Sequence, residues 1–205
     1  MAPVHLVVDG DDTLWENNVY FERAIDEFIQ FLAHSSMSRE QVRAALDEIE
    51  RLNSQVQGYG SLAFSRNLHQ CYERLCEREI RPDDLDHVVS LGERIMKEPL
   101  RLIDGVEPTL HYLADRHELT LLTKGQVEEQ KLKIERSGLA GYFRQTVVVK
   151  EKDRGAYQTL VAGRRWQPEQ TWMVGNSPRS DINPALAAGL NAVYIPLVEE
   201  PGLVK

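Results

Sequence analysis

The sequence predicts an α/β protein: a Rossmann-like parallel sheet with helices on both faces, plus a small helical bundle inserted after the first strand. Three observations predict this fold. A short apolar run at residues 5–8 ends at an Asp-Gly-Asp-Asp cluster, which is typical of a buried strand followed by a turn. Residues 15–98 show helical periodicity throughout. From residue 100 onward, strand-like and helix-like segments alternate, which indicates a parallel sheet.

The inserted segment predicts four amphipathic helices that bury their apolar stripes against one another. In the first helix, apolar residues recur at helical spacing, at Phe21, Ile25, Phe28, Ile29 and Leu32. Ser38 and Gln41 form a capping-box pattern, so we expect a second helix to begin there and to bury a stripe that ends at Leu52. Breaks at residues 58–60 and at Pro82 separate the third and fourth helices.

The alternating part predicts four more strands and the helices between them. The expected strands are 119–122, 146–149, 171–174 and 192–195, and the expected helices are 127–136, 157–163 and 181–188. Because the N-terminal strand has no partner nearby in the chain, we expect it to join this later sheet. The expected domains are therefore an α/β core of residues 1–14 and 100–205 and a helical domain of residues 15–99.

Composition excludes some classes of partner. The chain has 24 Lys and Arg against 32 Asp and Glu, a net charge of −8, and it contains no basic cluster of the kind that binds nucleic acid. No apolar run approaches the roughly 20 residues of a membrane-spanning helix. The N-terminal segment lacks the pattern of a signal peptide, so we expect a cytoplasmic protein that binds neither nucleic acid nor membrane. The sequence leaves a monomer and a homodimer equally open.

Polar residues cluster at the predicted carboxyl ends of four strands, the edge at which open parallel sheets bind ligands. They are Asp9, Asp11, Thr123, Lys150, Lys152, Asn176 and Asp181. If the strands are neighbours, three carboxylates, a hydroxyl and an ammonium converge on one crevice. Clustered carboxylates repel one another unless a cation lies among them, and an all-oxygen site suits Mg²⁺. A hydroxyl and a lysine that face this cation would clamp a phosphoryl group.

These residues resemble the four motifs of the haloacid dehalogenase-like (HAD) hydrolase superfamily, in the same order. Asp9-Gly10-Asp11-Asp12-Thr13 is similar to the first motif, Asp-x-Asp-x-Thr, and Thr123 is similar to the second. Lys152 resembles the lysine of the third motif, and the segment from Gly175 to Asp181 resembles the acidic fourth motif. The helical insertion directly after the first motif resembles the helical (C1-type) cap of the phosphatase branch. The resemblance covers essentially the whole chain.

The resemblance implies a catalytic role for four of these residues. Asp9 is the expected nucleophile, and Asp11 is the expected general acid and base, which protonates the leaving group and then deprotonates water. Thr123 and Lys152 are expected to bind the phosphate, and Lys152 also holds the nucleophile. Two alternatives stay open. Thr123 could be a helix N-cap, and Lys150, which lies closer to the strand end, could take the place of Lys152.

The resemblance also implies a Mg²⁺ site. Its expected ligands are Asp9, the backbone carbonyl of Asp11, Asp181 and Asn176. Asn176 departs from the family pattern, which commonly has Asp at that position, and the change removes one negative charge from the site. Asp181 has an alternative role as a helix N-cap.

The expected function is a magnesium-dependent phosphatase that hydrolyses a small phosphorylated metabolite through an aspartyl-phosphate. Besides Thr123 and Lys152, the residues expected to bind this substrate are Trp15, Asn17 and Tyr20, where the chain leaves the first motif for the cap. A phosphomutase would use the same aspartates, and a haloacid dehalogenase would share the nucleophile but need neither Asp11 nor a metal. A catalytically idle relative that binds a partner is the alternative outside enzymes. A dinucleotide-binding protein would require a Gly-x-Gly-x-x-Gly turn, which does not follow the first strand.

Overall fold

The structure, a computed structural model, describes residues 4–196. The chain divides into two compact units: an α/β unit of residues 1–16 and 100–205, and a helical unit of residues 17–99. The sequence predicts the first boundary two residues earlier, after residue 14. Trp15 belongs to the α/β unit because its backbone forms isolated bridges with Asp11 and with Leu102.

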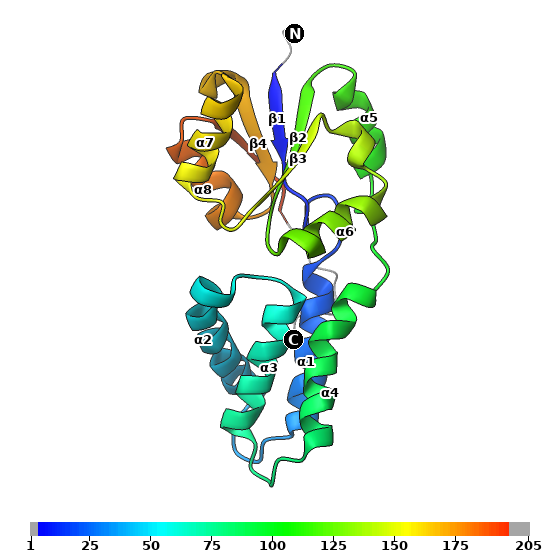
Figure 1. Cartoon of the computed structure of the whole chain (residues 1–205), viewed down its shortest axis with the longest axis vertical. Helices are drawn as coiled ribbons and strands as arrows, with labels where there is room; N and C mark the ends of the chain where they lie inside the picture. The colour runs from blue at the N-terminus through cyan, green and yellow to red at the C-terminus, as the bar shows by residue number, and fades with distance from the viewer. Residues whose placement is uncertain (1–3, 197–205) are drawn as a thin grey trace. The chain divides into compact units, whose positions relative to one another are not determined.

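A five-stranded sheet forms the middle of the α/β unit (Figure 1). Its strands are β1 (His5–Val8), β2 (Glu118–Lys124), β3 (Gln145–Val149), β4 (Thr171–Gly175) and β5 (Asn191–Tyr194). All pairs are parallel, in the order β3-β2-β1-β4-β5. Leu6 of β1 is paired with Leu119 on one side and with Trp172 on the other. The prediction that the N-terminal strand joins the later sheet is therefore confirmed.

Helices cover both faces of this sheet because its strands are apolar on both sides. The helices are α5 (Val106–Ala114), α6 (Val127–Ser137), α7 (Arg154–Arg164) and α8 (Asn183–Ala187). On one face, Leu6 and Val8 share a buried cluster with residues of α5 and α6. On the other face, Val7 and Leu122 share a cluster with residues of α7 and α8. Successive residues of β1 thus point to opposite layers, and the predicted Rossmann-like fold is confirmed.

Two parts of the α/β unit differ from the prediction. The sequence does not predict α5, because its nine residues bury only Val106 and Leu110, too few for a clear stripe. The helix expected at 181–188 is interrupted: Pro178–Ile182 forms a π-helical segment, η4, and α8 begins at Asn183. The remaining short segments are 3₁₀ helices: η1 (Arg94–Lys97), η2 (Ala140–Tyr142) and η3 (Pro168–Gln170).

The helical unit has a hydrophobic core of its own. Its helices are α1 (Asn18–Leu32), α2 (Arg39–Gln57), α3 (Ser61–Leu75) and α4 (Pro82–Glu93). Side chains from all four are fully buried in this core, among them Phe28, Leu46, Leu68, Tyr72 and Val88. The predicted capping box of α2 is confirmed: the Gln41 N–H donates to Ser38 Oγ at 3.3 Å, and the Ser38 N–H donates to Gln41 Oε1 at 2.8 Å.

The expected burial of Leu52 is wrong, because its side chain is 55% exposed. The helix α3 lies against α2 at this level, since Asn53 Nδ2 donates to Asn67 Oδ1 at 2.8 Å, so the Leu52 side chain lies on a part of the α2 surface that is not covered. Val56, one turn further on, is 89% exposed. The apolar stripe of α2 is thus buried only as far as Ile49.

Replacing Gly92 by alanine is expected to destabilise the helical unit. A Cβ at Gly92 in α4 would lie 2.3 Å from Ser65 Oγ and 2.9 Å from the Ser65 backbone nitrogen in α3, so the two helices would have to separate. Overpacking of this kind costs about 1–3 kcal/mol, and the free energy of unfolding measured in urea should fall by that amount. The control is Gly163→Ala in α7, where an added Cβ meets no atom within 4 Å. Equal effects of the two substitutions would contradict the close α3–α4 packing.

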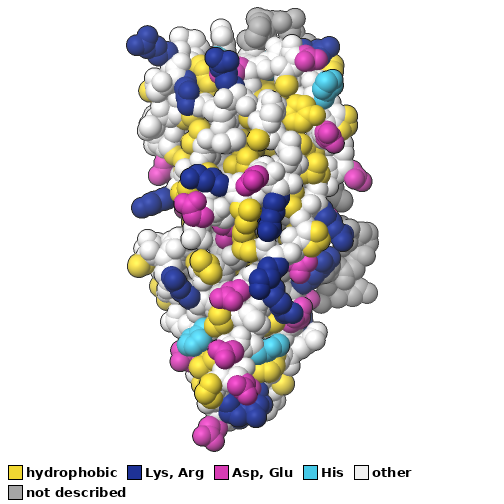
Figure 2. Space-filling view, turned by 45° about the vertical axis from the view of Figure 1, so that its right-hand side comes forward, with side chains coloured by type: hydrophobic (Ala, Val, Ile, Leu, Met, Phe, Trp, Pro, Cys, Tyr) yellow, Lys and Arg dark blue, Asp and Glu magenta, His cyan; other side chains and the backbone are white. Residues whose placement is uncertain are grey.

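Within residues 4–196, none of the helices combines the length and the apolar character needed to cross a membrane. On the face shown in Figure 2, Lys and Arg side chains are interspersed with Asp and Glu side chains. Mixed charges of this kind are typical of a solvated surface.

Candidate active site

The expected nucleophile, Asp9, comes directly after β1, the central strand of the sheet. The Asp9 N–H donates to the carbonyl of Val174 in β4 at 2.9 Å, which fixes the Asp9 backbone at the carboxyl end of the strand. The residue is 6% exposed. Thr13 Oγ donates to Asp9 Oδ2 at 3.2 Å, and Lys152 Nζ donates to Asp9 Oδ1. Both oxygens of this buried carboxylate are therefore held in place.

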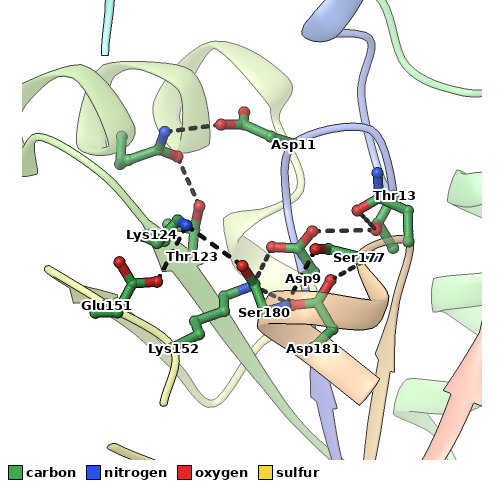
Figure 3. A network of polar contacts seen from close by, with 12 residues as sticks. Asp9, Asp11, Thr13, Thr123, Lys124, Glu151, Lys152, Ser177, Ser180 and Asp181 are labelled. Atoms are coloured by element: carbon green, nitrogen blue, oxygen red, sulfur yellow. Dashed lines mark hydrogen bonds and ion pairs between the residues drawn. The ribbon is translucent and has the colours of Figure 1, made fainter. Parts of the chain in front are cut away.

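Lys152 bridges Asp9 and a second buried carboxylate, Asp181 (Figure 3). Lys152 Nζ donates to Asp181 Oδ1 at 2.7 Å, and the lysine side chain is buried. Lys150, the alternative that the sequence leaves open, is exposed. The structure thus brings Lys152, and not Lys150, to the expected nucleophile.

Asp181 lies in η4 and is fully buried. Its Oδ2 accepts a hydrogen bond from the Ser177 N–H at 2.9 Å. The N-cap of η4 is Ser177, whose Oγ accepts from the Ser180 N–H at 3.1 Å, and the N-cap of α8 is Ile182, so the alternative role of Asp181 as an N-cap is wrong. A glycine is required at position 175, because a Cβ on Gly175 would lie 2.5 Å from Asp181 Oδ2.

Burial and charge shift the pKa values of the buried pair. Burial raises the pKa of Asp9 to about 6, although Lys152 lowers it, and the charge of Asp181 raises it further. Burial alone would lower the pKa of Lys152, but Asp9 and Asp181 hold it above its usual value. With all three groups ionised, two carboxylates and one ammonium leave one uncompensated negative charge. A bound cation is the natural partner for such a charge.

The carboxylate of Asp11 does not join that of Asp9, which corrects the expected convergence of three carboxylates. It accepts hydrogen bonds from Trp15 Nε1 at 2.7 Å, from Gln130 Nε2 at 2.9 Å and from Lys133 Nζ at 3.0 Å. In Figure 3, Asp11 lies apart from Asp9. The physical reason is that three donors, on the loop and on α6, satisfy the Asp11 carboxylate away from Asp9, although its charge still helps to raise the pKa of Asp9.

Thr123 is buried near the carboxyl end of β2. Its Oγ donates to Gln130 Oε1 at 2.8 Å. The N-cap of α6 is Gln126, so the alternative role of Thr123 as an N-cap is wrong. Through Gln130, the expected phosphate-binding hydroxyl is linked to Asp11, the expected general acid and base.

Asn176 follows β4, and its Oδ1 lies 3.4 Å from Thr13 Oγ, a second acceptor for the hydroxyl proton that Asp9 Oδ2 also accepts. The same hydroxyl also contacts Asp9, so Asn176 lies on the Asp9 side of the site. The structure therefore brings together Asp9, Lys152, Asp181 and Asn176, and it places Thr123 beside Asp11 through Gln130.

Two of the three further residues expected at the substrate, Trp15 and Tyr20, are buried, and their contact with a substrate stays a prediction. Trp15 is 1% exposed, packs in the core of the α/β unit and donates its indole N–H to Asp11. Tyr20 is 7% exposed, and its hydroxyl donates to the carbonyl of Pro99 at 2.8 Å inside the helical unit. Both side chains are packed, and both donate a hydrogen bond within their own unit. Asn17 precedes α1 as its N-cap residue and is half-buried.

Sequence patterns do not single out five polar residues that the structure brings to this edge of the sheet. Gln130 and Lys133 bind Asp11, and Lys124 donates to Glu151 at 3.1 Å and to Ser180 Oγ at 3.3 Å (Figure 3). Gln130 and Lys133 are three residues apart on α6, a spacing that places them on one helix face. That spacing is the signal in the sequence, but it does not reveal which strand end the face approaches.

The oxygen atoms near Asp9 fit a Mg²⁺ ion. Asp9 and Asp181 offer carboxylate oxygens, Asn176 offers an amide oxygen and Asp11 offers its backbone carbonyl. Over residues 4–196, no three His, Cys, Asp or Glu side chains gather closely enough to form a metal site by themselves. Mg²⁺ binds through one or two carboxylates and keeps several waters, so a set with only two carboxylates suits it.

The model of the haloacid dehalogenase-like hydrolase family matches residues 5–189. Among solved structures, a haloacid dehalogenase-like family hydrolase from Xanthomonas campestris is 31% identical to this chain. That match covers 98% of this chain and 88% of the other, with a TM-score of 0.88. No curated protein sequence matches the chain significantly.

More distant solved structures share the fold. YfnB from Bacillus subtilis, a candidate HAD-hydrolase bound to magnesium, is 17% identical over 95% of this chain and 87% of its own, with a TM-score of 0.68. A predicted phosphoglycolate phosphatase from Haemophilus somnus is 17% identical over 95% of this chain and 89% of its own, with a TM-score of 0.64. Structures named as a 2-haloacid dehalogenase and as a candidate β-phosphoglucomutase also match. From the match over residues 5–189 and the 31% identity, the chain belongs to the haloacid dehalogenase-like hydrolases.

Proposed function

We propose that this hydrolase is a magnesium-dependent phosphatase that cleaves a small phosphorylated metabolite through an aspartyl-phosphate on Asp9. The observation that carries the proposal is the buried contact of Lys152 with both Asp9 and Asp181. This contact joins the proposed nucleophile, a cation for the phosphoryl group and a carboxylate for the metal, which follow β1, β3 and β4. Phosphoryl transfer depends mainly on such positioning and charge neutralisation.

In the first step, a carboxylate oxygen of Asp9 attacks phosphorus while the bond from phosphorus to the leaving oxygen breaks. Lys152 donates a hydrogen bond to a phosphoryl oxygen, and the Thr123 hydroxyl donates to another after it turns away from Gln130. Asp11 in its acid form gives its proton to the leaving oxygen, which departs as an alcohol. The presence of Asp11 favours a phosphate ester over a haloacid, because a halide leaves without a proton.

In the second step, Asp11 is a carboxylate and takes a proton from a water molecule. That water attacks phosphorus, the bond between phosphorus and Asp9 breaks, and inorganic phosphate forms. The proton that Asp11 gave to the leaving oxygen is thus replaced by a proton from water. Mg²⁺, held by Asp9, Asp181, Asn176 and the Asp11 carbonyl, would supply positive charge to the phosphoryl oxygens.

The helical unit is proposed to act as a cap that selects the substrate, with the half-buried Asn17 as a contact where the chain enters it. Relatives named as a phosphoglycolate phosphatase and a β-phosphoglucomutase support phosphoryl chemistry on this fold. A phosphomutase would return the phosphoryl group to a sugar, whereas a phosphatase passes it to water.

Removal of Mg²⁺ is expected to abolish turnover. Phosphate release from a panel of phosphomonoesters should fall by more than about a hundredfold when EDTA replaces Mg²⁺, because the charge on the phosphoryl oxygens is then unmatched. Added Mg²⁺ should restore the rate. Equal release with and without the metal would contradict the proposal. Transfer of label to a second sugar, with no free phosphate, would identify a mutase instead.

A further inference from the structure

Gln130 stands in the middle of a hydrogen-bond chain that joins the phosphate-binding hydroxyl to the general acid and base. Thr123 Oγ donates to Gln130 Oε1 at 2.8 Å, and Gln130 Nε2 donates to Asp11 Oδ2 at 2.9 Å. A carboxylate only accepts hydrogen bonds, so the amide nitrogen must face Asp11 and the amide oxygen must face Thr123. Gln130 is 3% exposed, and water therefore does not compete freely for either bond.

The surrounding chain leaves room for this amide. Gly125 has a φ of +144°, a conformation that residues with side chains rarely adopt, and a Cβ there would lie 3.2 Å from Gln130 Nε2. A larger residue at position 125 would thus press on the amide. Lys133 Nζ and Trp15 Nε1 approach the same Asp11 carboxylate, at 3.0 Å and 2.7 Å. Three donors from two segments fix the orientation of Asp11.

We propose that Gln130 is a positioning residue that orients Asp11 for proton transfer and couples this orientation to phosphate binding at Thr123. The inference rests on the proposed phosphatase function. Gln130 itself is not a catalytic residue, because it acts through Asp11 and Thr123.

The coupling between phosphate binding at Thr123 and the orientation of Asp11 follows because a hydroxyl group has a single proton to donate. While Thr123 donates to Gln130, it offers only lone pairs to a ligand, and the oxygens of a phosphate need donors. Phosphate binding therefore turns the Thr123 hydroxyl away and leaves Gln130 Oε1 buried without its donor, which is unfavourable. Because Gln130 is bonded to Asp11 at its other end, a change at Thr123 bears on the hydrogen bond that Asp11 accepts.

The first test needs no turnover. The chain contains three tryptophans, so the indole N–H resonance of Trp15 can be assigned by replacing Trp166 and Trp172 in turn with phenylalanine. Gln130→Met keeps the length of the side chain but removes both hydrogen bonds, and it is expected to shift the Trp15 resonance because Asp11 loses a restraint. Gln126→Met, an exposed substitution at the N-cap of the same helix, is the matched control and should leave the resonance in place.

The second test compares leaving groups. p-Nitrophenyl phosphate reacts without protonation of its leaving group, whereas an alkyl phosphate needs the proton of Asp11. In single turnovers, Gln130→Met should slow phosphorylation of the enzyme by the alkyl phosphate by roughly ten- to hundredfold. The rate with p-nitrophenyl phosphate should fall by less than about threefold. In an Asp11→Asn background, Gln130→Met should slow the reaction of the alkyl phosphate by less than about twofold. The reason is that Gln130 acts through Asp11, so its replacement has little further effect once Asp11 is lost.

An unshifted Trp15 resonance, or equal losses with the two substrates, overturns the proposal. The proposal is also overturned if Gln130→Met slows the alkyl phosphate reaction as much in the Asp11→Asn background as in the wild type. A faster reaction of the alkyl phosphate in Gln130→Met overturns it too. If the wild type releases no phosphate from any compound while the Trp15 resonance shifts, the phosphatase function fails and the positioning of Asp11 by Gln130 stands.

Discussion

Replacing Lys152 by methionine is expected to slow phosphate release by about a hundred- to a thousandfold and to lower the free energy of unfolding by about 3–5 kcal/mol. Both effects have one cause. The lysine ammonium is the shared partner of two buried carboxylates, Asp9 and Asp181, and methionine would leave their charges uncompensated. Urea unfolding without metal, together with phosphate release at saturating Mg²⁺, measures the two losses separately.

Lys150→Met is the matched control for this substitution. It removes the same charge two residues away, but from an exposed side chain, and should change the free energy of unfolding by less than about 0.5 kcal/mol. Mg²⁺ should stabilise Lys152→Met more than the wild type, because a cation at the two carboxylates replaces part of the lost charge. Similar effects of the two lysine substitutions would contradict the assignment of Lys152 to the site.

Replacing Asp9 by asparagine is expected to lower phosphate release by more than about a thousandfold, because the nucleophile is lost. The fold should survive. Burial raises the pKa of Asp9 to about 6, above its value in an unfolded chain, so the ionised form costs folding free energy that grows as the pH rises from about 4 to 6 and is complete above 6. At pH 8 asparagine avoids this cost, and the free energy of unfolding should fall by no more than about 1 kcal/mol.

Asp12→Asn serves as the control for Asp9→Asn. Asp12 has a φ of 59°, a left-handed conformation that asparagine tolerates well, and it has no assigned part in the chemistry. Its replacement should retain most of the phosphate release. A fully active Asp9→Asn enzyme would show that the reaction does not pass through a bond to Asp9.

Sequence patterns predicted most of the strands and helices, because these elements depend on local periodicity. The apolar run at His5–Val8 and the capping box at Ser38 are confirmed as predicted, since each depends on a few consecutive residues. Leu52 is exposed although it continues the α2 stripe, because its burial depends on how the neighbouring helices pack, which periodicity does not report. The helix α5 was not predicted, because it buries only Val106 and Leu110 and therefore shows no clear apolar stripe in the sequence.

In the site, too, local motifs predicted some residues, and residues that depend on tertiary packing were missed. The residues that the motifs point to, Asp9, Lys152 and Asp181, meet in one buried group because they follow neighbouring or nearby parallel strands. The surroundings of Asp11 could not be predicted, since Gln130 and Lys133 reach it only through the way α6 docks on the sheet. Trp15 packs in the core of the α/β unit and donates its indole N–H to Asp11, two contacts that residue spacing does not encode.

The central claim is that phosphate passes through a covalent bond to Asp9, and the most direct measurement is to trap that bond. The enzyme would be mixed with Mg²⁺ and a turning-over phosphomonoester, quenched in acid within the first turnover, and digested for mass spectrometry. We predict a phosphoryl group on the peptide that contains Asp9, labile to hydroxylamine as an acyl phosphate and missing from Asp9→Asn. Turnover with no phosphorylated peptide, or with the phosphoryl group on another residue, would contradict the account.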